Sequence, residues 1–528
     1  MKQKILILLI IACSFFSVSA QKEQNNWFFG EGAGLTWNKT VTMAATGVFG
    51  TANKVLNDLP TSLGVTPIKT FEGCFSLSDV DGNLLFFSDG MTIWDKNMNP
   101  MFNGGELTGN NSSAQSGIII PYPSSSSRYI AVTLGERMAN NLSYSIVNMT
   151  LSGGLGAVEG ANKNILLTGH KGLLGETVTA VRHSNRDDFW IVALGRPEVG
   201  TTTSYLNVWK VSSTNGVQTS CYSTFTIPNA GGTADAANGY IKFTSDGKHF
   251  VTSNFANRYF MYGGFDPSTG KVLNVKIRAN AYFPTAIRGG AYGVEFSPNG
   301  KYLYLTQTPT GVSGTIDMGT GLFIYDLDAL LSAPDPNTIS PIKTLQNPAS
   351  LANGLNDHFG GIQRAPDNRI YITNFNSAGM FIIENPDEPL SLRVYKIDKM
   401  FNGRASFGLP SFAAPWFKIH ITPPSDTQAC SEATESYSLS FENGMGFNLV
   451  SRIVLDFGDG GNNSQVTINN PNITATYTHS YYYKAPGTYT ITATAYNSSG
   501  GVEITQTSTM IIRSCVLKVN KHIRGVNQ

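Results

Sequence analysis

The chain has 528 residues, of which 41% are hydrophobic and 14% are charged, and its formal net charge is +1. The high apolar content and low charge exclude an intrinsically disordered chain and predict two or more folded domains. Because the charge is near zero and no basic stripe is present, nucleic acid is excluded as a partner.

The first twenty residues have the pattern of a secretory signal peptide. Two lysines precede an apolar run over residues 5–16, and Ala20 then offers a small-residue cleavage site before Gln21. That run is shorter than the ~20 residues that a membrane-spanning helix needs, and no later segment is apolar enough over such a length. A lipoprotein box at residues 10–13 is a weaker alternative. We therefore expect an exported protein without a transmembrane segment.

A pattern of strand, tight turn and strand recurs along residues 73–373, with looser copies near residues 118 and 179. The turns of the clearest copies are Asp81-Gly82, Asp246-Gly247, Asn299-Gly300 and Asp367-Asn368. Such residues favour tight turns because Gly, and to a lesser degree Asn, accepts a positive φ. Repeats of about 40–60 residues are typical of a β-propeller. The sequence predicts an all-β protein with a seven-bladed, WD-repeat-like β-propeller over residues 21–418, and six or eight blades are the alternatives.

Both ends of this region contain strand-like pieces that lie outside the complete repeats. Residues 27–29 and 35–37 come before the first repeat, and residues 407–413, continuing to Trp416 and Phe417, come after the last. A propeller removes its exposed edges by closing the ring, so we expect these pieces to share one composite blade. Binding functions are expected on the Gly- and Ser-rich loops, which are residues 45–69, 104–117, 151–176, 215–239 and 308–321.

The pattern changes after a proline-containing linker over residues 419–428. Five strands are expected within residues 429–515, at residues 436–441, 453–456, 474–479, 487–496 and 502–512. Short strands at this spacing predict a β-sandwich, and residues 516–528 are expected to form a loose basic tail.

Four cysteines follow the leader. Cys430 and Cys515 bracket the expected sandwich, and an exported protein can form disulfides, so we expect these two to pair. Cys74 and Cys221 lie in different repeats and are expected to be buried thiols that pack as small apolar side chains.

Two groups of residues resemble known families. The turn Leu455-Asp-Phe-Gly-Asp-Gly460, followed by His479-Ser-Tyr481 and by Pro486-Gly-Thr-Tyr-Thr-Ile491, resembles a PKD domain, an immunoglobulin-like sandwich of extracellular proteins. Other pieces resemble the propeller region of gliding-motility-associated, PKD-containing surface proteins of bacteria with type IX secretion: Asn26-Trp-Phe-Phe-Gly30, Glu72-Gly-Cys74, Asp89-Gly90, Ile93-Trp94, Gln115-Ser116 and Gly408-Leu-Pro-Ser-Phe412.

The resemblance implies a protein of the cell envelope. Such proteins often continue into further PKD domains and a C-terminal sorting domain, which this chain does not show. The sequence therefore leaves three possible locations. The protein could reach the cell surface with the help of a partner, remain in the periplasm, or belong to the outer-membrane-associated secretion or gliding apparatus. The expected partners are envelope or surface proteins, with polysaccharide as a further candidate.

Catalytic motifs are not evident. The chain has no G-x-S-x-G, H-E-x-x-H or C-x-x-C sequence, so no nucleophile or zinc site is indicated. Asp79 and Asp81 have the alternating oxygen ligands of a calcium loop, and Asp456 and Asp459 offer a second acidic turn. Carboxylates in such turns more often bond the turn's own amides, so no cofactor is expected and calcium is kept as the alternative.

The preferred hypothesis is a non-enzymatic interaction protein, with the propeller as binding scaffold and the PKD-like domain as spacer or docking module. The first alternative is an accessory component of the secretion or gliding apparatus. The second is a glycan-active enzyme with acids from several blades at the central channel. Aromatic residues near strand ends are expected to pack between blades rather than to bind sugar; they are Trp94, Trp190, Trp209 and Tyr325.

Overall fold

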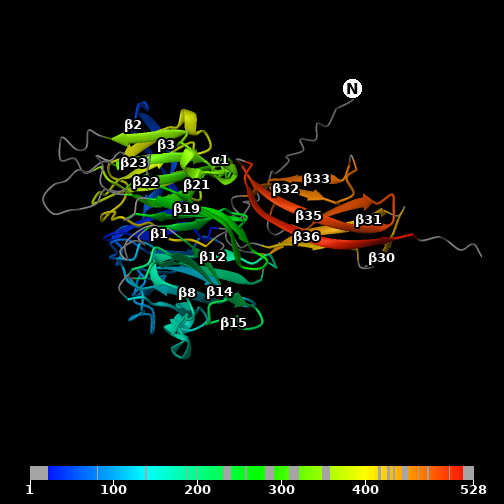
Figure 1. Cartoon of the computed structure of the whole chain (residues 1–528), viewed down its shortest axis with the longest axis horizontal. Coiled ribbons are helices and arrows are strands. Elements are labelled where there is room, and N and C mark those ends of the chain that lie inside the picture. The colour runs from blue at the N-terminus through cyan, green and yellow to red at the C-terminus, as the bar shows by residue number, and fades with distance from the viewer. Residues whose placement is uncertain are drawn as a thin grey trace, which may run out of the picture.

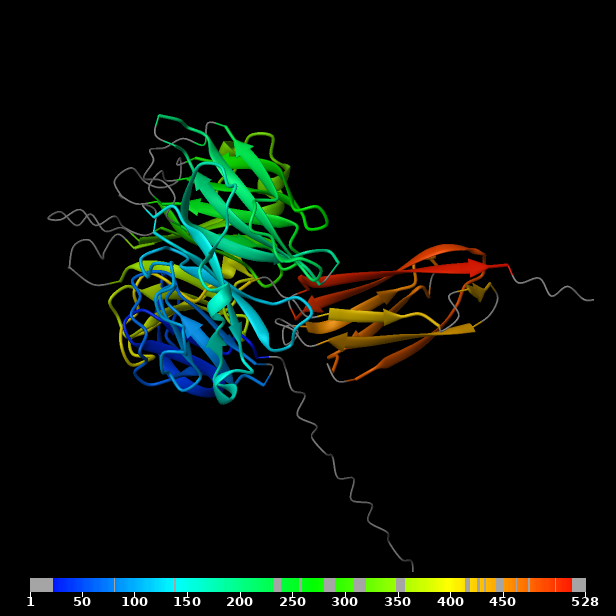
Figure 2. The ribbon, with the colours of Figure 1, turned by 90° about the horizontal axis from the view of Figure 1, so that it is seen from below.

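The protein is all-β. The computed structural model describes residues 22–514 except for residues 80, 137–138, 186, 199, 229, 231–238, 256–258, 280–289, 308–319, 348–356, 414–417, 425–427, 432–433, 443–449, 462, 473–474 and 499. Within the described part there are 36 strands and a single α-helix, α1 (Leu327–Ser332). The strands form two bodies, a larger one from residues 22–413 and a smaller, elongated one from residues 418–514 (Figures 1 and 2).

The larger body consists of consecutive antiparallel sheets. The first two contain β1 (Asn26–Phe29), β2 (Ala33–Val48) and β3 (Lys54–Ser62), and then β4 (Phe75–Ser78), β5 (Leu84–Ser88) and β6 (Ile93–Asp95). The next two contain β7 (Gly117–Pro121), β8 (Arg128–Leu134), β9 (Leu142–Asn148), β10 (Ala157–Val158) and β11 (Ile165–Leu166), and then β12 (Leu173–Arg182), β13 (Phe189–Arg196), β14 (Ser204–Ser212), β15 (Gly216–Val217) and β16 (Ser223–Ile227).

Two four-stranded sheets follow. They contain β17 (Ile241–Phe243), β18 (His249–Asn254), β19 (Tyr259–Asp266) and β20 (Lys271–Arg278), and then β21 (Ala291–Phe296), β22 (Tyr302–Gln307), β23 (Thr320–Asp326) and β24 (Lys343–Asn347). The last four strands are β25 (Phe359–Arg364), β26 (Ile370–Asn374), β27 (Met380–Ile383) and β28 (Val394–Ile397), and they form one seven-stranded sheet with β1, β2 and β3.

The predicted tight turns are confirmed. Gly82, Gly247, Gly300 and Asn368 all have a positive φ, between 60° and 89°. They join β4 to β5, β17 to β18, β21 to β22 and β25 to β26 in antiparallel pairs. In each turn the backbone N–H of the positive-φ residue donates to the carbonyl three residues earlier. The Asp-Gly and Asn-Gly signals therefore placed these hairpins correctly.

The sheets follow one another around a ring. The first strand of each sheet contacts the first strand of the next, in the order β4, β7, β12, β17, β21 and β25. β1 contacts β4 on one side. On the other side, the far end of β2 pairs with β28, with Thr46 opposite Lys396 and Val48 opposite Val394. The ring therefore closes because the first and last strands of the larger body join in one seven-stranded sheet, which leaves no open edge at that position.

The sequence predicted a different closure, in which residues 27–29 and 35–37 share one blade with residues 407–417. Among the described residues, the turn between β1 and β2 makes one bridge to the end of the region, between Glu31 and Arg404, and residues 407–413 form no strand. Pro410 lacks an N–H, and it forms only an isolated bridge, with Cys74. Trp416 and Phe417 lie outside the described residues.

Residues 404–413, here called the central segment, run instead through the middle of the ring. The Phe407 carbonyl accepts from Thr373 Oγ1 (3.1 Å), the Leu409 N–H donates to the Tyr240 hydroxyl (3.1 Å), and the Ser411 N–H donates to the Cys74 carbonyl (2.8 Å). These partners belong to β26 and to the residues just before β17 and β4. The central segment therefore connects three separate sheets.

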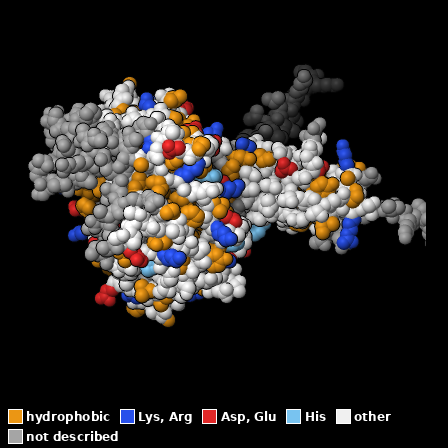
Figure 3. Space-filling view, viewed as in Figure 1, with side chains coloured by type: hydrophobic (Ala, Val, Ile, Leu, Met, Phe, Trp, Pro, Cys, Tyr) orange, Lys and Arg blue, Asp and Glu red, His pale blue; other side chains and the backbone are white. Residues whose placement is uncertain are grey.

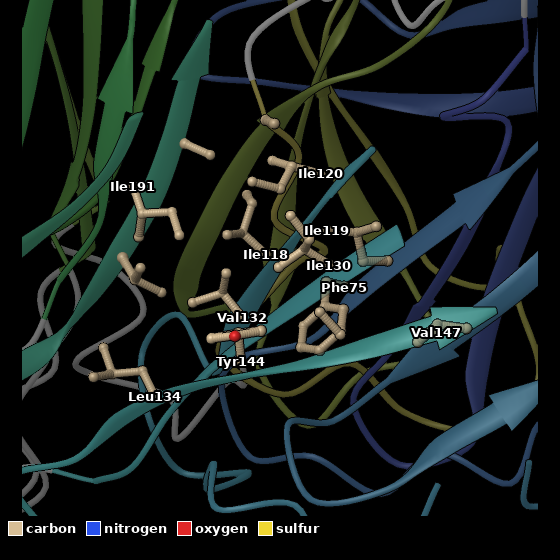
Figure 4. Close-up of a cluster of buried hydrophobic side chains, with 14 of the residues drawn as sticks. Phe75, Ile118, Ile119, Ile120, Ile130, Val132, Leu134, Tyr144, Val147 and Ile191 are labelled. Atoms are coloured by element: carbon tan, nitrogen blue, oxygen red, sulfur yellow. The ribbon is translucent and has the colours of Figure 1, made fainter. Parts of the chain in front are cut away.

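Apolar side chains fill the space between neighbouring sheets. Figure 4 shows one such cluster, in which Ile118 and Ile120 of β7 lie near Ile130 and Val132 of β8, and all four are fully buried. Burial of one such side chain contributes about 1.5–3 kcal/mol. The aromatic residues that recur near strand ends were expected to pack inside the protein, and the structure confirms this. Each of them is at most 9% exposed; they are Trp94, Trp190, Trp209 and Tyr325.

The smaller body contains two facing sheets. One has the order β29 (Lys418–Thr422), β31 (Thr434–Glu442) and β34 (Tyr477–Tyr482). The other has the order β30 (Gln428–Cys430), β36 (Val502–Arg513), β35 (Gly487–Asn497), β32 (Val450–Asp456) and β33 (Gln465–Asn469). A separate apolar core includes Tyr437, Ile453 and Ile491.

Five strands of this body were predicted, and β29, β30 and β33 were not. Residues 419–422 were assigned to the linker but form most of β29, because Ile419 and Ile421 contribute apolar side chains to the core while the backbone pairs with β31.

We expect removal of residues 21–38 to unfold the larger body. The deletion takes away β1 and the part of β2 that pairs with it, and the fully buried Trp27 and Phe28 leave the core. The first sheet would then lose the ladder that supports its contact with β4. Thermal unfolding followed by circular dichroism checks this expectation. A deletion variant that kept the parent's cooperative transition would contradict it.

No helix within the described ranges combines the length and the apolar character needed to cross a membrane.

Candidate functional site

Three neighbouring first strands carry a polar residue at the same position. Lys242, Glu295 and Gln363 lie in β17, β21 and β25, and each comes five residues before the positive-φ residue of its turn. Lys242 Nζ donates to Glu295 Oε2 (2.6 Å), Gln363 Oε1 (2.8 Å) and the Ile362 carbonyl (3.0 Å). All three N–H donors of the ammonium are thus used by adjacent sheets, which is what a mostly buried charge requires.

This polar row continues into the smaller body through Arg364. Its backbone N–H donates to Glu295 Oε2 (2.7 Å), and its guanidinium lies 3.5 Å from Glu503 Oε1 in β36. Glu503 is fully buried, and the same oxygen accepts from Asn497 Nδ2 (2.8 Å). Within the described part of the chain, its other oxygen makes no hydrogen bond. Loss of Arg364 would leave a buried carboxylate without its countercharge, which is strongly destabilising.

The turn between β35 and β36 packs directly on the larger body. The Asn497 side-chain amide donates to the Pro298 carbonyl, next to the Asn299-Gly300 turn. Gly501 lies so close to Pro298 that a Cβ at this position would collide with the Pro298 carbonyl. Figure 1 shows this end of β35 and β36 against the larger body. The two bodies therefore meet through specific hydrogen bonds and close backbone packing.

A cavity of about 250 Å³ lies at this meeting point, and we call it the junction pocket. Its wall includes the polar row, the turns at residues 244–247 and 297–300, α1, the end of the central segment and residues 501–502 of the smaller body. Charged side chains of both signs are scattered over the face seen in Figure 3, without an extended patch of either sign. The junction pocket is thus a mixed polar and apolar site between the two bodies.

Burial alters the protonation of two groups in the junction pocket. It lowers the pKa of the Lys242 ammonium, although the Glu295 carboxylate opposes this effect. Because the ion pair is only 2.6 Å long and the ammonium is fully hydrogen-bonded, we assign the charged form to Lys242. Burial also lowers the pKa of His249, which favours its neutral imidazole at neutral pH.

A second polar cluster lies at the opposite end of the first strands. Glu72, just before β4, accepts from the Tyr292 hydroxyl of β21 at 2.9 Å. Glu176 of β12 accepts from the Ala114 N–H at 3.3 Å. Burial, and then the charge of Glu176, raise the pKa of Glu72 from 4.5 to about 8. The two buried carboxyl groups, one before β4 and one in β12, thus lie close enough to interact, and the raised pKa favours the protonated form of Glu72 at neutral pH.

The first predicted calcium turn uses its carboxylate internally. Asp79 Oδ1 accepts from the N–H groups of Asp81 (3.0 Å) and Asn83 (2.8 Å), and Oδ2 accepts from the Asn83 side chain (3.0 Å). A calcium ion would have to compete with these three bonds, whose pattern is that of an Asx turn.

The second predicted calcium turn is also hydrogen-bonded. Asp456 accepts from the Gly458 N–H (2.7 Å) and the Gln465 side chain (2.7 Å). Asp459 accepts from the Gly461 N–H (2.9 Å) and the Tyr481 hydroxyl (2.6 Å). In the described residues, no group of three or more His, Cys, Asp or Glu side chains is placed to hold a metal ion.

The cysteine predictions meet the structure only in part. Cys74 is a buried free thiol, and Cys221 is a half-buried one. β30 runs parallel to β36, and Cys430 lies opposite Arg513. Arg513 is two residues before Cys515 in the sequence. Cys515, the Cys430 side chain and the expected cleavage position between Ala20 and Gln21 lie outside the described residues. The disulfide stays a prediction, and the register of β30 on β36 favours it.

We expect a reductant to lower the melting temperature of the smaller body and to leave that of the larger body nearly unchanged. The closed loop would contain about 85 residues, for which chain entropy gives roughly 4–5 kcal/mol before strain. Calorimetry of the full chain with and without reductant measures this, and Cys430→Ser with Cys515→Ser is the matched control. Two free thiols by mass spectrometry of the unreduced protein would contradict the pairing.

The junction pocket was not predicted from the sequence. Binding was expected on the long loops, whereas the pocket is built from the short turns and from residues at one repeat position. A signal was present, because Lys242, Glu295 and Gln363 are polar residues at the same distance from three successive turns. Their role depends on contacts between sheets, which no single repeat contains.

Searches against known proteins gave only distant likenesses. No family model and no curated protein matches the sequence. A putative 6-phosphogluconolactonase from Bacteroides uniformis has 14% identity, covers 78% of this chain and 98% of its own, and has a TM-score of 0.36. The Dos1 propeller has 10% identity, covers 66% of this chain and 76% of its own, and has a TM-score of 0.29. The PKD domain of an M14-like peptidase from a Thermoplasmatales archaeon has 18% identity, covers 18% of this chain and 91% of its own, and has a TM-score of 0.15. Function therefore has to be inferred from the residues of this chain.

Proposed function

We propose that the chain is an exported binding protein of the bacterial cell envelope. The ring of sheets is interpreted as a seven-bladed β-propeller that serves as a scaffold, and the smaller body as a PKD-like module. The signal-peptide pattern of residues 1–20 and the resemblance to gliding-associated surface proteins support the location. The repeated hairpins and the ladder between β2 and β28 support the propeller interpretation.

The observation that carries the proposal is the junction pocket. It is an open cavity of about 250 Å³ to which both bodies contribute. Lys242 is paired with Glu295, and Arg364 is paired with Glu503 of the smaller body, so these groups help to hold the two bodies together and shape the walls. Ligand pockets occur preferentially at the interface between domains, so the position of the junction pocket favours binding.

Retention of an envelope component by the immobilised full chain tests this function. Ser245, which is half-buried on the 244–247 turn, is replaced by tryptophan to fill the pocket. We expect at least one envelope component to be enriched on the natural chain and lost from the Ser245→Trp variant. Equal retention by the two chains, or no retention by either, would count against binding at the junction pocket.

One observation favours a second function, that of a glycan-active enzyme. Glu72, just before β4, and Glu176 of β12 interact, and burial raises the pKa of Glu72 to about 8, as is typical of the general acid in hydrolysis of a glycosidic bond. Incubation with a panel of polysaccharides, followed by detection of new reducing ends, tests this function. An enzyme would release product that the Glu72→Gln variant does not release, and the absence of product from the natural chain would refute it.

A further inference from the structure

The two buried cations of the junction pocket are already paired. Lys242 and Glu295 are 2.6 Å apart, and the Arg364 guanidinium and Glu503 are 3.5 Å apart. An anionic ligand would have to break one of these pairs, which is costly in a partly buried site. It would also meet the exposed carboxylate of Asp328, which lines the pocket and forms no ion pair with the described residues. The site therefore discriminates against an anionic ligand.

Hydrogen-bonding groups nevertheless remain available in the junction pocket. The Arg364 guanidinium has five N–H donors, and its side-chain contacts to the described residues are two long ones, to Glu503 (3.5 Å) and to Ser245 Oγ (3.4 Å). The His249 ring makes no hydrogen bond to the described residues, and as a neutral imidazole it offers one donor and one acceptor. A ligand rich in hydroxyl groups can satisfy donors and acceptors of this kind together.

Apolar side chains form the rest of the wall. Phe412, at the end of the central segment, and Leu327 and Leu331, of α1, line the same cavity. A flat apolar surface beside scattered polar groups suits a sugar ring, because the faces of the ring carry C–H groups and its edge carries hydroxyl groups. The cavity volume, about 250 Å³, is below the ~300–1,000 Å³ of pockets for drug-sized ligands, so the ligand is short.

We propose that the junction pocket binds a neutral saccharide of one or two sugar rings, held by Arg364 and His249 and packed against Phe412. This inference rests on the proposed binding function and names its ligand class. Because Val502 of the smaller body also lines the cavity, the bound sugar contacts both bodies. The sugar is either a free oligosaccharide or the end of an envelope polysaccharide, and both present the same chemistry.

Binding is measured on the purified full chain by saturation-transfer NMR and calorimetry. The probes are neutral hexoses, N-acetylhexosamines and their disaccharides, compared with the matching uronic acids. We expect at least one neutral member to bind with a Kd of about 1 mM or tighter, and its uronic acid to bind about tenfold more weakly. An uncharged polysaccharide that carries the same terminal sugar then distinguishes the polymeric source from the free one. Failure of every neutral probe, or tighter binding of the acidic ones, would overturn the proposal.

Two variants locate the site. Ser245→Trp fills the cavity and is expected to weaken binding by more than about tenfold, whereas His249→Ala removes one donor–acceptor group and is expected to weaken it several-fold. His183→Ala is the matched control, because His183 is a half-buried histidine that does not line the pocket. Sugar binding that Ser245→Trp leaves unchanged would overturn the proposal even if all variants keep their melting temperatures.

The two failures are distinguishable. If no neutral sugar binds but an envelope component is still lost from the Ser245→Trp variant, the binding function stands and the saccharide inference falls. If neither sugars nor envelope components respond to Ser245→Trp, both fall.

Discussion

Replacement of Gly408 by alanine is expected to abolish the cooperative unfolding transition of the larger body. Gly408 lies in the central segment against the backbone of Glu72, and a Cβ at this position would collide with the Glu72 carbonyl oxygen, its carbon and Cα. Backbone atoms cannot turn away as a flexible side chain does. Overpacking of side chains costs about 1–3 kcal/mol, and a backbone clash at the centre of the ring is expected to exceed that range. Denaturant unfolding followed by tryptophan fluorescence measures the loss.

Gly105→Ala is the matched control for this prediction. No atom lies within 4 Å of a Cβ built on Gly105, and its φ does not require glycine. We therefore expect it to unfold as the natural chain does. A Gly408→Ala variant with the stability of Gly105→Ala would show that the central segment is not packed as described.

The stability of the protein is expected to fall as pH rises from about 4.5 to about 8, and Glu72→Gln is expected to flatten this fall. Burial raises the pKa of Glu72 to about 8 from the 4.5 expected in the unfolded chain. The folded state therefore binds this proton more tightly, so the contribution of Glu72 to stability is fully present below pH 4.5 and is lost as pH approaches 8. A shift of this size corresponds to about 5 kcal/mol. A glutamine keeps an acceptor for the Tyr292 hydroxyl and carries no charge.

Denaturant unfolding of both chains at pH 5, 6, 7 and 8 tests this linkage. Burial also raises the pKa of Glu23 to about 8, so Glu72→Gln should remove part of the slope rather than all of it. Glu136→Gln changes an exposed acid and should leave the slope unchanged. Identical pH profiles for the natural chain and Glu72→Gln would mean that Glu72 is ionised in the folded state.

Local signals predicted the hairpins well. The turns at Gly82, Gly247, Gly300 and Asn368 follow from φ preferences that act within four residues, so they are readable from the sequence. The burial of Trp190 and Trp209 was also predicted, because large aromatic side chains contribute most when they pack between sheets.

The features that were missed depend on residues far apart in the chain. The ladder between β2 and β28 joins residues about 350 positions apart, and nothing in the alternation of β2 indicates its partner. The same holds for Lys242, whose three acceptors lie in two other sheets, and for Glu503, whose countercharge is in the other body. The short strand β33 is different, because Gln465-Val-Thr-Ile-Asn469 does alternate polar and apolar residues and its Ile468 lies in the core, so this strand was readable from the sequence but was not predicted.

The path of the central segment determines how the chain would carry a mechanical load. Tension applied at residue 418 reaches the larger body through residues 404–413, which are bonded to Thr373, Tyr240 and Cys74 in three different sheets. The load is therefore shared among sheets around the ring axis, instead of peeling β28 from β2 one hydrogen bond at a time. In single-molecule pulling from both termini, we expect the smaller body to extend first and the ring to yield afterwards in one abrupt event.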